Sequence, residues 1–179
     1  MFSQKGFYNT TIPDIAKAMK MSVGNMYNYF SSKEELAKFA IKYSTNILAE
    51  ELKEINHLDV SSKEKIYIFV KKYLENVQNS PEVIEYFLRV YLSNREVFKQ
   101  GCEGFLCVGE FVTEVMILLD DGASRKEFRQ QDFFPAFSMI MGCLGGFAFL
   151  SGEKVLDKDL LSYSDAVADN IYRALKYDN

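Results

Sequence analysis

Apolar residues recur every three or four positions through most of this chain, the spacing that places them on one face of an α-helix. The pattern is clear in residues 36–47, 66–77 and 105–119. The chain has only ten Gly and three Pro, and each proline lies where a helix can begin. This composition argues against a sandwich or barrel with many turns, so we predict an all-α protein.

The first 45 residues predict two short helices followed by a long one. Thr11-Ile-Pro-Asp14 has the hydroxyl, the proline and the acid of a capping box, and it starts a helix over residues 12–19. Ser22 can cap a second helix that reaches residue 28 or 30, in which Met26 and Phe30 face inward. Two short helices joined by a tight turn are the outline of a helix-turn-helix. A further capping pattern at Ser32 starts a helix that extends to about residue 56.

The remainder of the chain predicts five more helices. Ser61 and Glu64 form another capping box, and the helix that they start ends before Pro81, which opens the next one. A third helix stops at Asp120-Asp-Gly122. The predicted ranges are 61–80, 81–92, 105–119, 135–151 and 165–176.

Charge and cysteine content narrow the class of protein. The net charge is -4, but residues 1–45 carry six Lys and three acids, so that this part is +3 and the rest is -7. A basic N-terminal segment joined to an acidic remainder suggests that residues 1–45 bind an anion. Three cysteines without CxxC spacing predict buried free thiols, with neither a disulfide framework nor a zinc site.

Targeting signals are also expected to be absent. The N-terminus has no basic segment followed by a long apolar stretch. The longest apolar stretch, residues 133–150, contains Pro135, Ser138 and three Gly, and we expect these residues to interrupt it before it reaches the length of a membrane span. We therefore predict a cytoplasmic protein with no membrane partner.

Three motifs stand in order near the N-terminus: Phe2-Ser-Gln-Lys-Gly-Phe-Tyr8, Thr10-Thr-Ile-Pro-Asp-Ile-Ala16, and Met21-Ser-Val-Gly-Asn-Met-Tyr-Asn-Tyr-Phe30 followed by Ser32-Lys-Glu-Glu-Leu36. Together they resemble the N-terminal DNA-binding domain of the TetR family of bacterial transcriptional regulators. The resemblance implies a helix-turn-helix DNA-binding domain over residues 1–45 and a helical effector-binding and dimerisation domain over 46–179. Because the family places most of a first helix before Phe2, we expect that helix to be mostly absent from this sequence.

The resemblance also implies a function, a repressor that binds a palindromic DNA operator as a homodimer and responds to a small-molecule effector. The DNA-binding residues that it implies are Thr11, Ser22, Val23, Gly24, Asn25, Tyr27, Asn28, Tyr29 and Lys33. Asn can pair with adenine through two hydrogen bonds and Val can touch a thymine methyl, so we expect A·T pairs under Asn25 and Val23. Val23 and Tyr29 depart from the family, which often has Lys and His at these positions.

The body carries the remaining candidate sites. Aromatic side chains at helical spacing are mostly core residues, but together they could enclose a cavity for a largely apolar or aromatic effector. The candidate lining residues are Tyr73, Phe87, Tyr91, Phe105 and Phe111. Glycines in an apolar helix suggest close helix approach across a twofold axis. The candidate dimer residues are Gly142, Gly145, Gly146, Phe149, Val167, Ile171 and Leu175.

Two other classes of protein remain as alternatives. A helical dimeric interaction protein with a degenerate, non-DNA-binding helix-turn-helix would agree with the short first helix and with Val23. An enzyme is disfavoured, because the sequence shows no Ser-His-Asp order, no metal-ligand spacing and no glycine-rich phosphate loop. We expect no cofactor and no metal.

Overall fold

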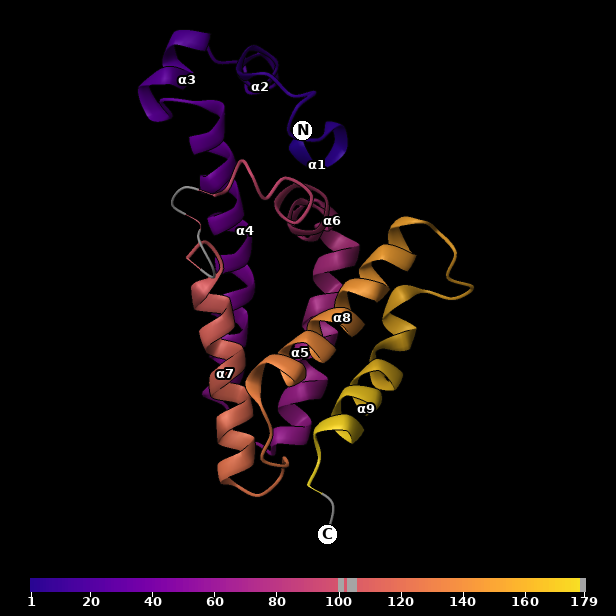
Figure 1. Ribbon diagram of the computed structural model, residues 1–179. Coiled ribbons are helices and arrows are strands. Elements are labelled where there is room, and N and C mark those ends of the chain that lie inside the picture. The colour runs from indigo at the N-terminus through magenta and orange to yellow at the C-terminus, as the bar shows by residue number, and fades with distance from the viewer. Residues whose placement is uncertain (100–101, 103–105, 178–179) are drawn as a thin grey trace. The chain divides into compact units, whose positions relative to one another are not determined.

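The computed structural model describes residues 1–99, 102 and 106–177, and the regular structure of this part of the chain is helical apart from one isolated bridge between Phe128 and Lys176 (Figure 1). The all-α prediction is therefore confirmed. The chain forms two compact units. The first unit joins Met1–Asn46 to Glu82–Gly109, and the second joins Ile47–Pro81 to Glu110–Asn179.

The first unit contains the short helices at the N-terminus, the first half of α4, and the segment that follows Pro81. Thr11 Oγ1 accepts a hydrogen bond from the Asp14 N–H at 3.3 Å, and Ser22 Oγ accepts one from the Asn25 N–H at 3.1 Å. These bonds satisfy N–H groups that the first turn of a helix leaves free. The capping pattern therefore predicted both helix starts correctly. The helices are α1 (Phe2–Lys5), α2 (Ile12–Ala18), α3 (Val23–Tyr29), α4 (Lys33–Asn56), α6 (Pro81–Glu85) and the π-helix η1 (Tyr86–Tyr91).

Tyr86, at the start of η1, joins this segment to the N-terminal helices. Its hydroxyl donates a hydrogen bond to the carbonyl oxygen of Ala37 on α4 at 2.8 Å, and its ring centroid lies 5.9 Å from that of Phe2. Ser3 Oγ donates to the Glu82 carbonyl at 3.3 Å. Burial raises the pKa of Tyr86, so its hydroxyl stays protonated and remains a donor. Sequence periodicity predicted one continuous helix over residues 81–92 and did not predict that its second part is a π-helix.

The second unit is built on α5 (Ser62–Asn79), which packs against α8 (Phe133–Gly152) and α9 (Ser164–Leu175). The predicted capping box at its start is present, because Ser61 Oγ accepts from the Glu64 N–H and the Glu64 carboxylate accepts from the Ser61 N–H. Helix α7 (Gly109–Ser124) and the short helix η2 (Leu160–Tyr163) complete this unit.

The predicted end of α7 at Asp120-Asp-Gly122 is wrong, because the helix continues to Ser124. A Cβ atom on Gly122 would lie 2.2 Å from Cδ2 of the buried Phe128 ring. Gly122 is therefore a packing site that admits this ring, and it does not terminate the helix. The predicted start of this helix, Phe105, lies outside the described residues.

The cysteines also differ from the prediction. Cys102 and Cys107 form a disulfide with a Cα–Cα distance of 4.9 Å, and Cys143 is the free thiol of the described residues. Spacing along the chain could not reveal this pair, because a disulfide depends on how the backbone brings two residues together.

A buried cation lies at one end of the second unit. The Lys65 side chain is almost fully buried, and its Nζ donates to the Asn56 carbonyl at 2.9 Å and to Asp121 Oδ2 at 3.0 Å. Arg125 Nε donates to the other carboxylate oxygen of Asp121 at 3.0 Å. Burial alone would raise the pKa of Asp121, but the hydrogen bonds from Lys65 and Arg125 outweigh it and leave this pKa below its ordinary value of 3.8.

We expect Asp121→Asn to lower the free energy of unfolding by about 2 kcal/mol at pH 7, because it leaves the Lys65 ammonium buried without its charged partner. The pKa of Asp121 is lower in the folded chain, so its contribution is present above the unfolded pKa and is lost as the pH falls through the folded pKa. Urea unfolding at pH 7 and below pH 4 measures both effects. A difference between the two proteins that stays constant across this range would contradict the assignment.

Candidate functional site

Helix α3 presents most of its surface to solvent. Met26 is buried in the small core of the first unit, as predicted, while the side chains around it are exposed. A Cβ atom on Gly24 would meet nothing within 4 Å, so the face around it is open to close approach. The exposed residues of this helix and its cap are Ser22, Val23, Gly24, Asn25, Tyr27, Asn28 and Tyr29.

Besides Ser22, which caps α3, the predicted DNA-binding residues Thr11 and Lys33 have side-chain partners within the protein. The Thr11 hydroxyl donates to Asp14 Oδ2 at 2.6 Å, and this bond lowers the pKa of Asp14. Lys33 Nζ donates to the Phe7 carbonyl at 3.1 Å and lies 4.2 Å from the centroid of the Phe7 ring. The first interaction is part of the capping box of α2, and the second holds the loop that follows α1 against α4, so these residues have a structural role as well.

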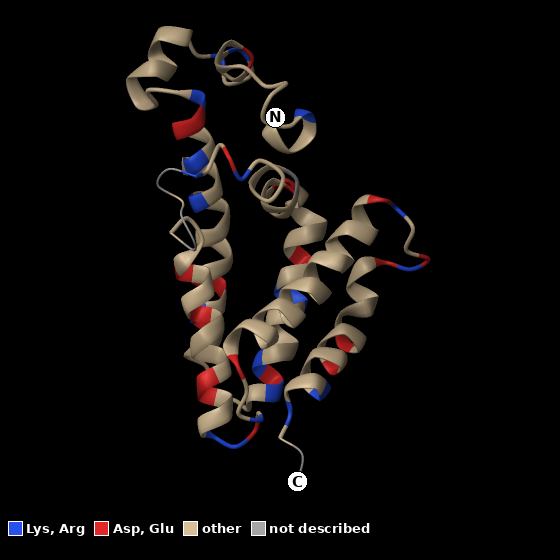
Figure 2. Ribbon diagram, in the orientation of Figure 1, with Lys and Arg blue, Asp and Glu red and all other residues tan. Residues whose placement is uncertain are grey.

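Charge is distributed unevenly around α3. Residues 15–33 contain Lys17, Lys20 and Lys33 and no Asp or Glu, and the carboxylates at the start of α4 begin at Glu34 (Figure 2). Phosphate groups are attracted to a surface that carries ammonium groups and no carboxylate. The exposed polar face of α3 thus lies within a part of the chain that favours an anionic partner.

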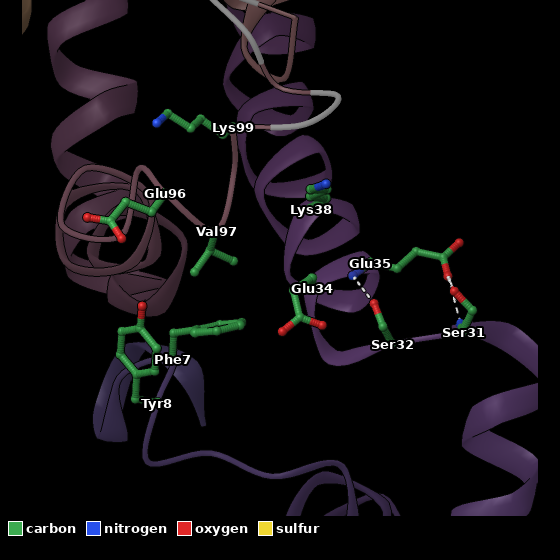
Figure 3. Close-up of a pocket in the computed structure, with 10 residues that line it drawn as sticks. All are labelled: Phe7, Tyr8, Ser31, Ser32, Glu34, Glu35, Lys38, Glu96, Val97 and Lys99. Atoms are coloured by element: carbon green, nitrogen blue, oxygen red, sulfur yellow. Dashed lines mark hydrogen bonds between the residues drawn. The ribbon is translucent and has the colours of Figure 1, made fainter.

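A pocket of about 760 Å³ lies on the first unit (Figure 3). On one side of it, the Glu35 carboxylate accepts hydrogen bonds from the N–H and the hydroxyl of Ser31, which lower the pKa of Glu35, while Ser32 Oγ accepts from the Glu35 N–H at 3.1 Å. The predicted effector residues that the structure describes, Tyr73, Phe87, Tyr91 and Phe111, do not line this pocket. Its lining residues are Phe7, Tyr8, Ser31, Ser32, Glu34, Glu35, Lys38, Glu96, Val97 and Lys99.

The structure places the predicted effector residues on both units. Tyr73 and Phe111 are buried in the second unit, where Phe111 lies 6.3 Å from Phe69 between ring centroids. In the first unit, Phe87 stacks on Tyr91 at 5.5 Å. Phe105 lies outside the described residues. Burial raises the pKa of Tyr73, so its hydroxyl is a neutral donor.

Helix α8 keeps most of its apolar surface exposed. Phe149 is 62% exposed, and Cβ atoms added at Gly142 or Gly146 would meet nothing within 4 Å. Gly145 is partly buried. The helix is continuous across Pro135 and the glycines, so the expectation that these residues interrupt the apolar stretch is wrong. Among the described residues, this is the one helix long and apolar enough to cross a membrane.

The predicted dimer residues of α9 require a correction. Val167, Ile171 and Leu175 are fully buried inside the chain, on the helix that packs against α5. Apolar spacing shows which face of a helix is buried, but it does not show which partner covers it. These three side chains belong to the core of the protomer and are not available to a second copy.

Comparison with known proteins agrees with this architecture. Residues 1–39 match the family model for bacterial regulatory proteins of the tetR family. The biofilm operon icaADBC negative transcriptional regulator IcaR of Staphylococcus epidermidis is 27% identical over 92 residues, which are 51% of this chain and 46% of that protein. The chain thus spans about half the length of the curated relatives that it matches.

Solved structures share the fold along nearly the whole chain. The regulator FadR from Bacillus subtilis, in complex with stearoyl-CoA, matches with a TM-score of 0.82 at 20% identity. The match covers 96% of this chain and 91% of the FadR chain. The TetR family regulator PfmR from Thermus thermophilus matches with a TM-score of 0.70 at 19% identity, over 96% of this chain and 92% of the PfmR chain. The N-terminal segment is thus similar to the tetR family model, and the fold of the chain is similar to that of TetR family regulators.

Proposed function

We propose that this protein is a transcriptional repressor that binds a palindromic DNA operator as a homodimer and is controlled by a small molecule. The observation that carries the proposal is the exposed polar face of α3, which lies in a stretch of the chain with lysines and no carboxylate. A partner of this kind implies a cytoplasmic location. Repression also agrees with the match to IcaR, which is a negative regulator.

The exposed residues of α3 divide into two kinds of DNA contact. Asn25 and Val23 can read base edges in the major groove, and the open space around Gly24 lets the backbone approach them. Tyr27, Tyr29 and Lys33 can hold backbone phosphates, which position a protein on DNA without specifying its sequence. Asn28 and Ser22 lie on the same exposed surface, where the Ser22 hydroxyl hydrogen is free to donate while its oxygen caps the helix.

Selection from random DNA duplexes tests this proposal. We expect the wild-type protein to enrich a palindrome, with A·T pairs under Asn25 and Val23 and a steep decrease of affinity with salt. Asn25→Ala should weaken operator binding by about 1–3 kcal/mol and relax the preference for adenine. Asn170→Ala, an exposed asparagine of α9, is the matched control and should bind like wild type. Enrichment of G·C pairs at these positions would contradict the assigned contacts, and no enrichment would contradict DNA binding.

The proposed dimer forms through α8. The exposed Phe149 and the open spaces at Gly142 and Gly146 provide an apolar surface with small residues in its middle, which lets a second helix approach closely. The opposite face of α8 already packs inside the protomer through Ala136, Ile140 and Leu144. We therefore assign the exposed face to a second copy of the chain and not to a lipid bilayer.

Gly146→Leu should shift the protein from dimer to monomer, because the new side chain fits within one protomer but blocks the approach of another. The measurement is sedimentation equilibrium, combined with operator binding. Gly24→Leu is a matched control, since that glycine is also helical and also has open space around it. It should remain dimeric and lose operator binding, while a Gly146→Leu protein that remains fully dimeric would contradict the α8 interface.

The proposed effector is largely apolar or aromatic. We assign the candidate residues of each unit separately: Tyr73 and Phe111 in the second unit, with Tyr73 able to donate one hydrogen bond, and Phe87 and Tyr91 in the first. The fold is shared with FadR in complex with stearoyl-CoA, so long-chain acyl-CoA is the first class of compound to test.

Titration of the operator complex with stearoyl-CoA should release the DNA, and Tyr73→Phe should shift the titration to higher concentration. Fluorescence anisotropy of a labelled operator measures the release. Free coenzyme A is the control, because it lacks the apolar chain. Release by coenzyme A alone, or no release by either compound, would contradict this effector class without affecting the DNA-binding proposal.

A further inference from the structure

Lys20 has an unusual backbone conformation in the turn between α2 and α3. Its φ angle is 55°, in the left-handed region where a side chain is disfavoured and where glycine is common at helix ends. The Lys20 N–H donates to the Lys17 carbonyl at 3.1 Å, and the Met21 N–H donates to the Ala16 carbonyl at 2.9 Å. This pair of bonds is the Schellman motif that closes a helix.

Two other lysines of the chain close helices in the same way. Lys126, after α7, has a φ of 59°, and Lys154, after α8, has a φ of 55°. Each donates the same backbone bond as Lys20, to Ala123 at 3.0 Å and to Ser151 at 3.1 Å. Left-handed lysines are thus a general way of ending helices in this chain, and the conformation by itself does not indicate a site.

The surroundings of Lys20 distinguish it from the other two. Lys126 is followed by Glu127, and Lys154 is preceded by Glu153, so each has a carboxylate next to it in sequence. Along the chain, the nearest carboxylates to Lys20 are Asp14 and Glu34, and that of Asp14 is hydrogen bonded to Thr11. Lys20 is exposed, and it stands two residues before Ser22, the cap of α3.

We propose that Lys20 contacts a backbone phosphate of the operator beside the start of α3. This inference rests on the proposed function and adds a residue to its DNA contacts. Position 23 is Val in this chain, so the start of α3 has no ammonium group of its own, and Lys20 supplies one from the preceding turn. A phosphate contact of this kind sets affinity and salt dependence but reads no base.

Lys20→Gly separates the structural and functional roles of this residue, because it relieves the backbone and removes the cation. We expect the midpoint of urea unfolding to rise and operator affinity at 100 mM salt to fall about fivefold to tenfold per protomer bound. The slope of log K against log salt should decrease in magnitude by about 0.9 for each protomer. Lys20→Arg keeps the cation and should keep the wild-type slope. Lys20→Asn removes the cation, although asparagine tolerates the same φ, and it should reduce the slope as Lys20→Gly does.

Lys126→Gly and Lys154→Gly are the matched controls. Both should raise the unfolding midpoint as Lys20→Gly does, and both should keep the wild-type affinity and salt slope. A Lys20→Gly protein with the wild-type slope would overturn the phosphate contact while leaving the proposed function in place. A wild-type protein that binds no duplex would instead contradict the proposed function itself.

Discussion

One continuous helix, α4, belongs to both compact units, and its hydrogen-bonded backbone is the constraint on which the rest of the structure depends. Residues up to Asn46 belong to the first unit and those from Ile47 to the second. Each turn of the helix is hydrogen bonded to the next, so the chain passes from one unit to the other without a break in its regular backbone. Polar contacts secure both halves: Tyr86 bonds to Ala37 in the first unit, and Lys65 bonds to Asn56 in the second.

The segment that follows Pro81 connects the proposed effector residues with the unit that carries the helix-turn-helix. It contains Phe87 and Tyr91, two of the proposed effector residues, and it belongs to the same compact unit as the helix-turn-helix. A ligand that binds these side chains would act directly on the unit that carries α3. Such a ligand changes DNA affinity only if it binds the DNA-bound and released conformations with different free energies.

Local rules predicted much of the fold and the exposure of the candidate DNA-binding residues on α3. Capping residues such as Thr11, Ser22 and Ser61 interact with backbone groups three residues away, so their effect is visible in sequence. Features that depend on distant partners were not predictable in this way. The spacing placed Val167 on an apolar face and assigned that face to a dimer, but it could not reveal that the face is buried within the protomer. Gly122 looked like a helix end because its partner, Phe128, lies beyond the turn.

The discontinuous first unit has a consequence for the order of events during synthesis. Ser3 and Phe2 find their partners in Glu82 and Tyr86, so their contacts close a loop of 79 residues or more. Contacts of such long range form late, because the intervening chain must be ordered before they contribute free energy. The N-terminal helices therefore leave the ribosome well before the segment that completes their core, and their apolar side chains stay exposed to chaperones and proteases until that segment follows.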